Sequence, residues 1–374
     1  METLTLNIVV ASINPLVNFN AFQDMLEKYQ CTVIVVDEGN RKIREKNCQI
    51  LRNINHEFYG PLEREQWFKE NFGSNYQKYV SLIPTRCHAE TSFGFLAAFQ
   101  KQPDLVIELD DDTFPILGQD LVKLHHDNLI KDDGRTVRSL GRWYNTVDNL
   151  VLNCNMRVFP RGHPYFEEAR TEQYLWTEKG GRCVLNMGLW VGQPDLDAVT
   201  ILHSGGLDGR SVLQATRLRE TKIIADRDTY FAICSMNTAF VTKIIPAFYQ
   251  LYMNFLGIDR FDDIWSGILL KKVVDHLGDN ICLGAPTVRH QKRPRDAFSD
   301  LKKEIDGMMI NEMLSRIVAE CDIDGGNYYD AYASLTGAVE ARIAKISSNI
   351  THSKFLRLQV SKMKKWLEAV DKLI

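Results

Sequence analysis

The sequence has 374 residues, of which 45% are hydrophobic and 25% charged, a composition typical of a globular protein. Its net charge of -3 lacks the basic excess that a nucleic-acid-binding chain carries, so we expect no nucleic-acid partner. The chain shows no secretory leader, and no apolar run approaches the roughly 18 residues that span a bilayer. The eight cysteines form no C-x-x-C pair, which disfavours a zinc site or a disulfide framework. We therefore expect a cytoplasmic protein.

Strand-like and helix-like segments alternate in the first third of the chain. Residues 6–12, 31–36 and 105–109 are apolar runs typical of buried strands. Residues 18–28 and 88–100 have the spacing of helices. This alternation predicts an α/β fold with a parallel sheet that is flanked by helices. In such sheets, ligands bind beyond the carboxyl ends of the strands.

The middle of the chain is less regular. Residues 113–215 are rich in Gly, Asn, Arg and aromatic residues, which indicates irregular structure with short strands. Further along, helices are predicted at 242–254 and 264–277, with a short strand at 281–283 between the second helix and the C-terminal part.

The C-terminal part is mainly helical. We therefore divide the chain into a ligand-binding domain, residues 1–305, and a helical C-terminal extension, residues 306–374. Residues 341–374 hold eight Lys or Arg and two Asp or Glu, a net charge of +6. Apolar residues there repeat at helical spacing: Leu356, Val360, Met363, Leu367, Val370 and Ile374. This helix packs either on its own domain or another subunit, or, as a basic amphipathic helix, on an acidic membrane surface.

Three consecutive aspartates follow the strand at 105–109. Adjacent carboxylates repel one another, so Asp110, Asp111 and Asp112 favour a site for a divalent cation bound to phosphate oxygens. Asp110 and Asp112 point to the same side of an extended chain and are the predicted ligands of Mn²⁺ or Mg²⁺. Asp111 points away, toward backbone or a basic side chain. The alternative is an acidic turn. The cation interpretation suggests a nucleoside diphosphate with a transferable group, most simply a sugar.

Other carboxylates stand at element ends. Asp37 ends the strand at 31–36, where it either contacts a nucleoside or forms a turn. Asp262 and Asp263 precede the helix at 264–277, where carboxylates stabilise the helix N-terminus. Their functional interpretation is a sugar-hydroxyl acceptor, a catalytic base or a nucleophile.

Two further segments carry candidate binding residues. Gly188 permits close backbone approach, and Trp190, after Leu189, either faces a sugar ring or belongs to a buried core strand. In the second segment His290 offers a metal-binding imidazole beside Lys292 and Arg293, cations that suit a diphosphate. A solvated loop is the alternative there.

Several of these segments together resemble one family, the reversibly glycosylated polypeptides, which include the plant UDP-arabinopyranose mutases. The resemblance covers roughly residues 5–310 and rests on six blocks in the same order. They are the triple aspartate at 110–112, G-L-W with P-D-L-D-A at 188–198, M-N-T-A-F at 236–240, R-F-D-D-I-W-S-G at 260–267, D-H-L-G at 275–278 and L-K-K-E at 301–304.

The resemblance implies a GT-A-type, Rossmann-like fold with a mixed, mostly parallel sheet. It also implies an enzyme, a glycosyltransferase or a mutase, that acts on a nucleotide sugar, with UDP favoured. It implies His290 as a third metal ligand, and Arg161, in the R-G-H-P-Y segment, as the family's glycosylated arginine. The implied nucleotide-sugar contacts include Asp37, Asp111, Gly188, Leu189, Trp190, Lys292 and Arg293. A glycan or protein acceptor and a homo-oligomer are possible partners. The alternative is a non-catalytic, nucleotide-sugar-binding scaffold subunit of a glycosylation complex.

Overall fold

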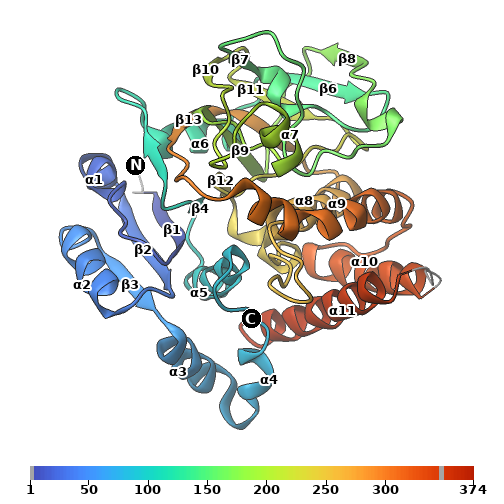
Figure 1. The fold of residues 1–374 in the computed structure, drawn as a ribbon. Coiled ribbons are helices and arrows are strands. Elements are labelled where there is room, and N and C mark those ends of the chain that lie inside the picture. The colour runs from blue at the N-terminus through green and yellow to red at the C-terminus, as the bar shows by residue number, and fades with distance from the viewer. Residues whose placement is uncertain (1–3, 345–348) are drawn as a thin grey trace.

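The computed structural model describes residues 4–344 and 349–374, and within this part of the chain thirteen strands form one sheet flanked by helices (Figure 1). The strands are β1 Thr5–Ser12, β2 Gln30–Asp37, β3 His56–Tyr59, β4 Leu105–Leu109, β5 Thr113–Pro115, β6 Arg135–Ser139, β7 Leu150–Leu152, β8 Tyr174–Thr177, β9 Leu185–Gly192, β10 Ala215–Leu218, β11 Lys222–Ala225, β12 Asn237–Phe240 and β13 Ile281–His290.

The α-helices are α1 Phe19–Leu26, α2 Arg41–Ile50, α3 Pro61–Phe72, α4 Gln77–Val80, α5 Thr91–Lys101, α6 Leu121–Ile130, α7 Ala198–His203, α8 Asp262–Leu277, α9 Ala297–Ala319, α10 Tyr328–Ile343 and α11 Ile350–Asp371. The short 3-10 helices are η1 Gly73–Asn75, η2 His88–Glu90, η3 Thr146–Asn149, η4 Glu167–Arg170 and η5 Thr242–Ala247.

The sheet is mixed, and most of its strands run in one direction. Its main path is β3-β2-β1-β4-β12-β9-β13-β11-β6-β8, in which β3, β2, β1 and β4 are parallel neighbours. The antiparallel β12 joins β4 to β9, and β9 pairs in parallel with β13. Figure 1 shows α8 to α11 grouped on the side of the molecule opposite β1 to β3. The predicted α/β class with a mixed sheet is confirmed.

The core explains why these apolar runs became strands. Ile8, Val9 and Val10 of β1 are fully buried between flanking helices. Helix α5 lies close to β1 because Gly94 has no side chain there. A Cβ at this position would collide with Val9. Helix α5 therefore packs closely on β1 and β2, the strands next to β4 in the sheet.

Three predicted segments differ in the structure. The predicted helix at 242–254 is a single 3-10 element, η5, followed by irregular buried chain. Pro246 lies inside η5, and its missing N–H and its ring disfavour a continuous α-helix. The predicted strand at 281–283 extends to His290, and the segment 113–215 contains the helix α6, which we did not predict.

The boundary predicted at residue 305 falls inside α9, one continuous helix from Ala297 to Ala319. Trp366 of α11 is fully buried and stacks on Tyr249, with ring centroids 5.2 Å apart. Its indole nitrogen donates to the carbonyl oxygens of Ile245 and Pro246, each at 3.2 Å. The extension therefore completes the hydrophobic core of the chain.

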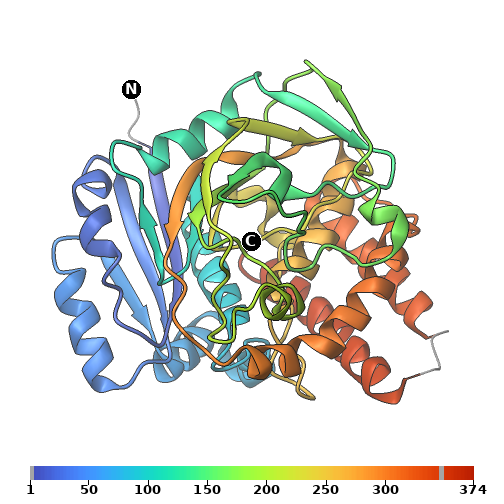
Figure 2. The same cartoon turned by 45° about the horizontal axis from the view of Figure 1, so that its top comes forward.

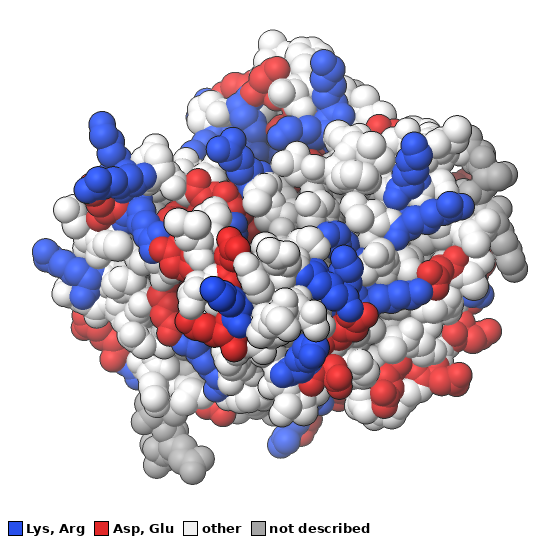
Figure 3. Space-filling view, turned by 90° about the horizontal axis from the view of Figure 1, so that it is seen from below, with Lys and Arg blue, Asp and Glu red and all other residues white. Residues whose placement is uncertain are grey.

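Of the alternatives given for α11, the apolar face of the helix takes the first and packs on the chain's own domain. Leu356, Val360, Met363, Leu367 and Val370 are buried against the protein's own core. No helix in the described ranges is long and apolar enough to cross a bilayer. On the face seen in Figure 3, acidic and basic side chains are interspersed and neither sign covers the surface.

Replacing Trp366 with alanine is expected to lower the free energy of unfolding by about 3–5 kcal/mol, because a large buried ring is removed. Urea denaturation followed by circular dichroism measures this change, and the loss should appear in one cooperative transition. The control Ser361→Ala, at an exposed position of α11, should change stability by less than about 0.5 kcal/mol. A separate transition confined to the C-terminal helices would contradict a shared core.

Candidate active site

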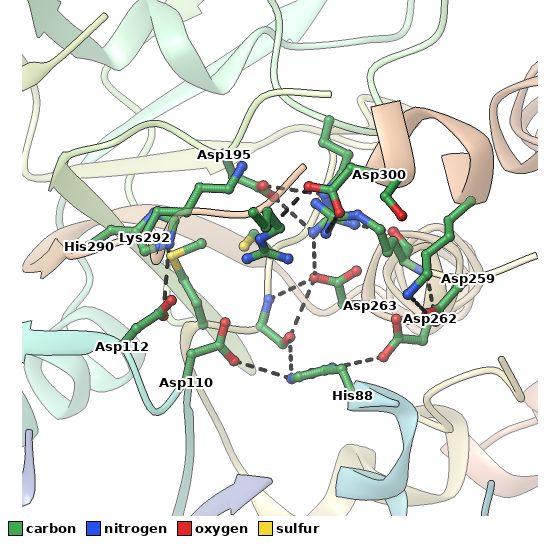
Figure 4. A pocket seen from close by; sticks show the side chains of 18 of the residues that line it. His88, Asp110, Asp112, Asp195, Asp259, Asp262, Asp263, His290, Lys292 and Asp300 are labelled. Carbon is green, nitrogen blue, oxygen red and sulfur yellow. Dashed lines mark hydrogen bonds and ion pairs between the residues drawn. The ribbon is translucent and has the colours of Figure 1, made fainter. Parts of the chain in front are cut away.

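A cavity of about 490 Å³ opens beyond the carboxyl end of β4, between the end of β13 and the first turns of α8 and α9 (Figure 4). It lies at the edge of the sheet where α/β folds bind ligands. The structure brings seven of the predicted residues to its wall: Asp110, Asp112, Arg161, Asp262, Asp263, His290 and Lys292.

Strand pairing gathers these residues from distant parts of the chain. The antiparallel pairing of β5 with β13 places His290 opposite Thr113, and Gln291 donates its backbone N–H to the carbonyl oxygen of Asp112 at 2.9 Å. Figure 2 shows β13, in orange, beside the blue-green strands of the N-terminal part. The end of β13 thus holds the histidine and the following lysine beside the aspartate triplet.

The three aspartates alternate as predicted. Asp110 and Asp112 line the cavity, whereas Asp111 turns away and accepts hydrogen bonds from Arg293 at 2.7 Å and from Asn14 at 3.0 Å. Arg293 therefore faces Asp111 and does not line the cavity, contrary to the expectation that it faces a diphosphate. The geometry gives Asp111 a role in fixing the loop that carries its two neighbours.

The cavity offers ligand types that suit Mn²⁺ or Mg²⁺. His290 Nδ1 lies 2.8 Å from the carbonyl oxygen of Gln193, which leaves Nε2 toward Asp112, with Nε2 3.8 Å from Asp112 Oδ1. Burial raises the pKa of Asp112 to about 6. Within the described residues, however, no three His, Cys, Asp or Glu side chains are arranged to hold a metal. These residues fit a cation that takes further ligands from a substrate, and not the three-residue site that we predicted.

His88, at the start of η2, was not predicted as a site residue. It lies at the centre of the acidic wall, the cavity surface formed by Asp110, Asp112, Asp262 and Asp263. Its Nδ1 is 2.7 Å from Asp262 Oδ2, and its Nε2 is 3.3 Å from Asp110 Oδ1 and 3.2 Å from the hydroxyl of Ser235. Burial alone would lower the pKa of His88, but the Asp262 and Asp110 carboxylates raise it well above its usual value. The sequence signal that could have identified His88 is its position at the start of the helical segment that precedes β4 and the aspartate triplet.

Arg161 forms a second charged group at the cavity wall. Its Nη2 and Nε bind the carboxylate of Asp195 at 2.9 and 3.2 Å, and Nη2 lies 3.6 Å from Asp263 Oδ2. Its Nη1 donates to the backbone carbonyl of Arg260. Burial raises the pKa of Asp195, yet the guanidinium holds that pKa at about 2. Burial raises the pKa of Asp263 to about 6. Asp195 was missed as a site residue.

Lys292 is a buried cation in the cavity wall whose ammonium makes no hydrogen bond within the described residues. Its side chain lines the cavity, the residue is 6% exposed, and Nζ has no hydrogen-bond partner within the described residues. Burial, followed by the charge of Arg260, lowers its pKa to about 8. A buried ammonium without a partner is costly, so the site is built to receive an anion or another acceptor.

Asp37 does not line this cavity. It ends β2 beside Ser12 of β1, and its carboxylate accepts the backbone N–H of Gly39 at 3.1 Å, the turn interpretation given above. The residue is buried, which raises the pKa of its carboxyl. Its contact with a nucleoside stays a prediction.

The segment Gly188, Leu189 and Trp190 does not reach the cavity either. Leu189 and Trp190 are buried inside β9, so the expectation that Trp190 faces a sugar ring is wrong in this structure. The groups that lie close to Gly188 belong to the protein and not to a ligand. A side chain there would lie 2.6 Å from the carbonyl oxygen of Pro286 and would collide with Asn237. These residues build the core strand beside β13.

Comparison with known proteins adds the family. A family model described as "Reversibly glycosylated polypeptide" matches residues 1–373. The chain belongs to the reversibly glycosylated polypeptide family. The match extends well beyond residues 5–310, where the sequence resemblance was visible, and includes the C-terminal helices that pack into the core.

Relatives within this family share about a quarter of their residues with the chain. UDP-arabinopyranose mutase 1 of Oryza sativa subsp. japonica is 26% identical, with 98% of this chain and 91% of that protein covered. UDP-arabinopyranose mutase 1 of Arabidopsis thaliana is 24% identical, with 98% and 92% covered. A crystal structure of glucosyl-3-phosphoglycerate synthase from Mycobacterium tuberculosis with Mn²⁺, UDP and glucosyl-3-phosphoglycerate has a TM-score of 0.41 at 13% identity, covering 82% of this chain and 79% of that one.

The sequence resemblance implies Arg161 as the counterpart of the family's glycosylated arginine. In this member all three guanidinium nitrogens are engaged, two by Asp195 and one by the carbonyl of Arg260. The residue lies in the cavity, but its contacts are those of a group that orients carboxylates. Its glycosylation stays a prediction.

Proposed function

We propose that this chain is a nucleotide-sugar enzyme that breaks the bond between the anomeric carbon of a sugar and the diphosphate of UDP. The observation that carries the proposal is the cavity itself. Asp110 and Asp112 form one side, and the unpartnered ammonium of Lys292 reaches the same space. An acidic side that accepts a cation, together with an unpaired buried cation, is complementary to a metal-bound diphosphate.

The residues divide the task according to charge. When the anomeric C–O bond breaks, negative charge develops on the leaving diphosphate, and the buried ammonium of Lys292 in the cavity wall stabilises it. Asp110 and Asp112 would hold a divalent cation, Mn²⁺ or Mg²⁺, whose further ligands would come from the diphosphate. When bound, that cation neutralises charge on the diphosphate.

The sugar end of the cavity is formed by the first turn of α8. Asp262 and Asp263 enter the cavity there, and both accept hydrogen bonds, Asp262 from His88 and Asp263 from the backbone N–H of Ser235. Fixed carboxylates bind sugar hydroxyls well, because each oxygen is a strong acceptor. Arg161 holds Asp263 from the opposite side.

Ring isomerisation is the favoured reaction, because the relatives that match almost the whole chain are UDP-arabinopyranose mutases. The test incubates the purified protein with UDP-arabinopyranose and with other single UDP-sugars, without acceptor and with Mn²⁺ or Mg²⁺. Ring-isomerised UDP-sugar, detected by chromatography and NMR, supports a mutase. Turnover that requires an added glycan or protein acceptor identifies a transferase. Tight UDP-sugar binding without any turnover would instead identify a scaffold.

Replacing Lys292 with methionine should weaken UDP binding while it stabilises the fold. Loss of a charge-assisted contact of about 1.5–3 kcal/mol predicts a Kd for UDP raised by roughly 10- to 100-fold. Removal of an unpartnered buried ammonium should raise the melting temperature. Calorimetry and thermal unfolding measure the two effects. Lys302→Met, at an exposed position outside the cavity, is the control, and unchanged UDP affinity in Lys292→Met would refute the phosphate contact.

A further inference from the structure

His88 lies between Asp262 and Asp110, two carboxylates to which the proposed function assigns different roles. One ring nitrogen is 2.7 Å from Asp262, which faces the sugar end, and the other is 3.3 Å from Asp110, which faces the cation end. Beneath the ring lies the fully buried Glu108, whose Oε1 is 3.5 Å from Nε2 and has no hydrogen-bond partner in the described part of the chain. In this structure the imidazole therefore faces three carboxyl groups (Figure 4 shows its bonds to the first two).

Both His88 and a bound cation would contact the same oxygen of Asp110, Oδ1. A divalent cation binds a carboxylate oxygen at about 2.0–2.4 Å, in a direction set by its other ligands. The Nε2 of His88 lies 3.3 Å from Asp110 Oδ1, an ion-pair distance for a protonated imidazole. An imidazole N–H that points at this oxygen also repels a cation placed there. A cation that binds Oδ1 from the side of the imidazole would therefore displace His88 from Asp110, whereas the bond to Asp262 is compatible with both arrangements.

We propose that His88 is a positioning residue that competes with the divalent cation for Asp110 and keeps Asp262 oriented toward the sugar when it yields. The inference rests on the proposed function, because it assumes a cation at Asp110. In the cation-free protein the imidazole holds the acidic wall together. On cation binding the Asp110 contact breaks and the Asp262 contact remains.

The exchange needs only a side-chain movement, because the backbone around His88 is fixed. On the N-terminal side of His88, the hydroxyl of Tyr249 donates to the carbonyl of Leu82 at 2.9 Å. On the C-terminal side, Glu90 is buried against Arg64, and the hydroxyl of Ser92 donates to the carbonyl of Gln250 at 3.1 Å. The His88 side chain itself is 28% exposed to the cavity, which leaves the ring room to turn.

The test measures Mn²⁺ binding directly, by electron paramagnetic resonance of free Mn²⁺, in the absence of nucleotide. His88→Ala should bind Mn²⁺ roughly tenfold more tightly than the wild type, a difference of about 1.4 kcal/mol, because the competitor is gone. The same variant should show a lower kcat with UDP-sugar, because Asp262 loses its 2.7 Å contact. His88→Gln, which keeps one hydrogen-bonding arm, should lie between the two. His126→Ala on α6, outside the cavity, is the matched control.

The opposite signs of the two effects separate competition from a merely structural role. Weaker or unchanged Mn²⁺ binding in both His88 variants would overturn the inference while the proposed reaction stands, provided that the wild type binds Mn²⁺ and turns over a UDP-sugar. Wild-type protein that binds Mn²⁺ but produces no altered UDP-sugar would overturn the proposed function and leave the competition measurable. Wild-type protein that binds no Mn²⁺ would overturn the inference.

Discussion

Asp110→Ala is expected to lower kcat/KM for a UDP-sugar by about a thousandfold, with the folded structure retained. A cation that neutralises a leaving diphosphate contributes several kcal/mol, and each 1.36 kcal/mol changes the rate about tenfold. Asp110 lines the cavity directly after β4, so its removal takes away a carboxylate ligand and leaves the strand intact. Initial-rate measurements over a range of Mn²⁺ concentrations quantify the loss.

Asp111→Asn is the matched control for this prediction. The side chain keeps its size and its bond to Asn14 but loses the charge that pairs with Arg293, and it lies outside the cavity. Its kcat/KM should stay within about tenfold of the wild type, the weight of one partly exposed ion pair. Chelation of divalent cations should reduce the wild type to the level of Asp110→Ala and leave that variant unchanged. A wild-type rate in Asp110→Ala would show that the reaction does not use a cation at the triplet.

The aspartate triplet and the parallel strands could be predicted because their signals are local. Three like charges after an apolar run are visible within eight residues of sequence, and alternation along an extended chain separates Asp111 from its neighbours. The apolar runs at β1, β2 and β4 are buried on both faces of the sheet and therefore read as continuous hydrophobic segments. Both inferences need no knowledge of which elements meet.

Contacts between distant segments could not be predicted in this way. His88 and its partner Asp262 are 174 residues apart, and nothing in either local sequence names the other. Trp190 could not be assigned from its local sequence, because an aromatic beside glycines is equally consistent with a ligand platform and with a core strand. Burial decides between them, and burial depends on β12 and β13 packing on both sides of β9.

Arg161→Ala is expected to lower the free energy of unfolding by about 3–5 kcal/mol at neutral pH. The change leaves the carboxylate of Asp195 buried without its partner and removes the nearby charge from Asp263. Chemical denaturation measures the loss. Arg182→Ala is the control, because its pair with Asp132 at 3.7 Å is largely exposed and should contribute about 0–1 kcal/mol.

The pH dependence of this loss identifies its cause. In the wild type the pKa of Asp195 is about 2, below the usual value of 3.8, so its pairing stabilises the fold above pH 4 and this stabilisation is lost as the pH falls toward 2. The difference between the wild type and Arg161→Ala should therefore be largest at neutral pH and shrink in acid. The double variant Arg161→Ala/Asp195→Asn should recover part of the lost stability, since no unpaired charge remains at that position. A loss that is constant from pH 3 to pH 7 would mean that Arg161 stabilises the fold through packing, and that the orientation of Asp263 in the cavity has another source.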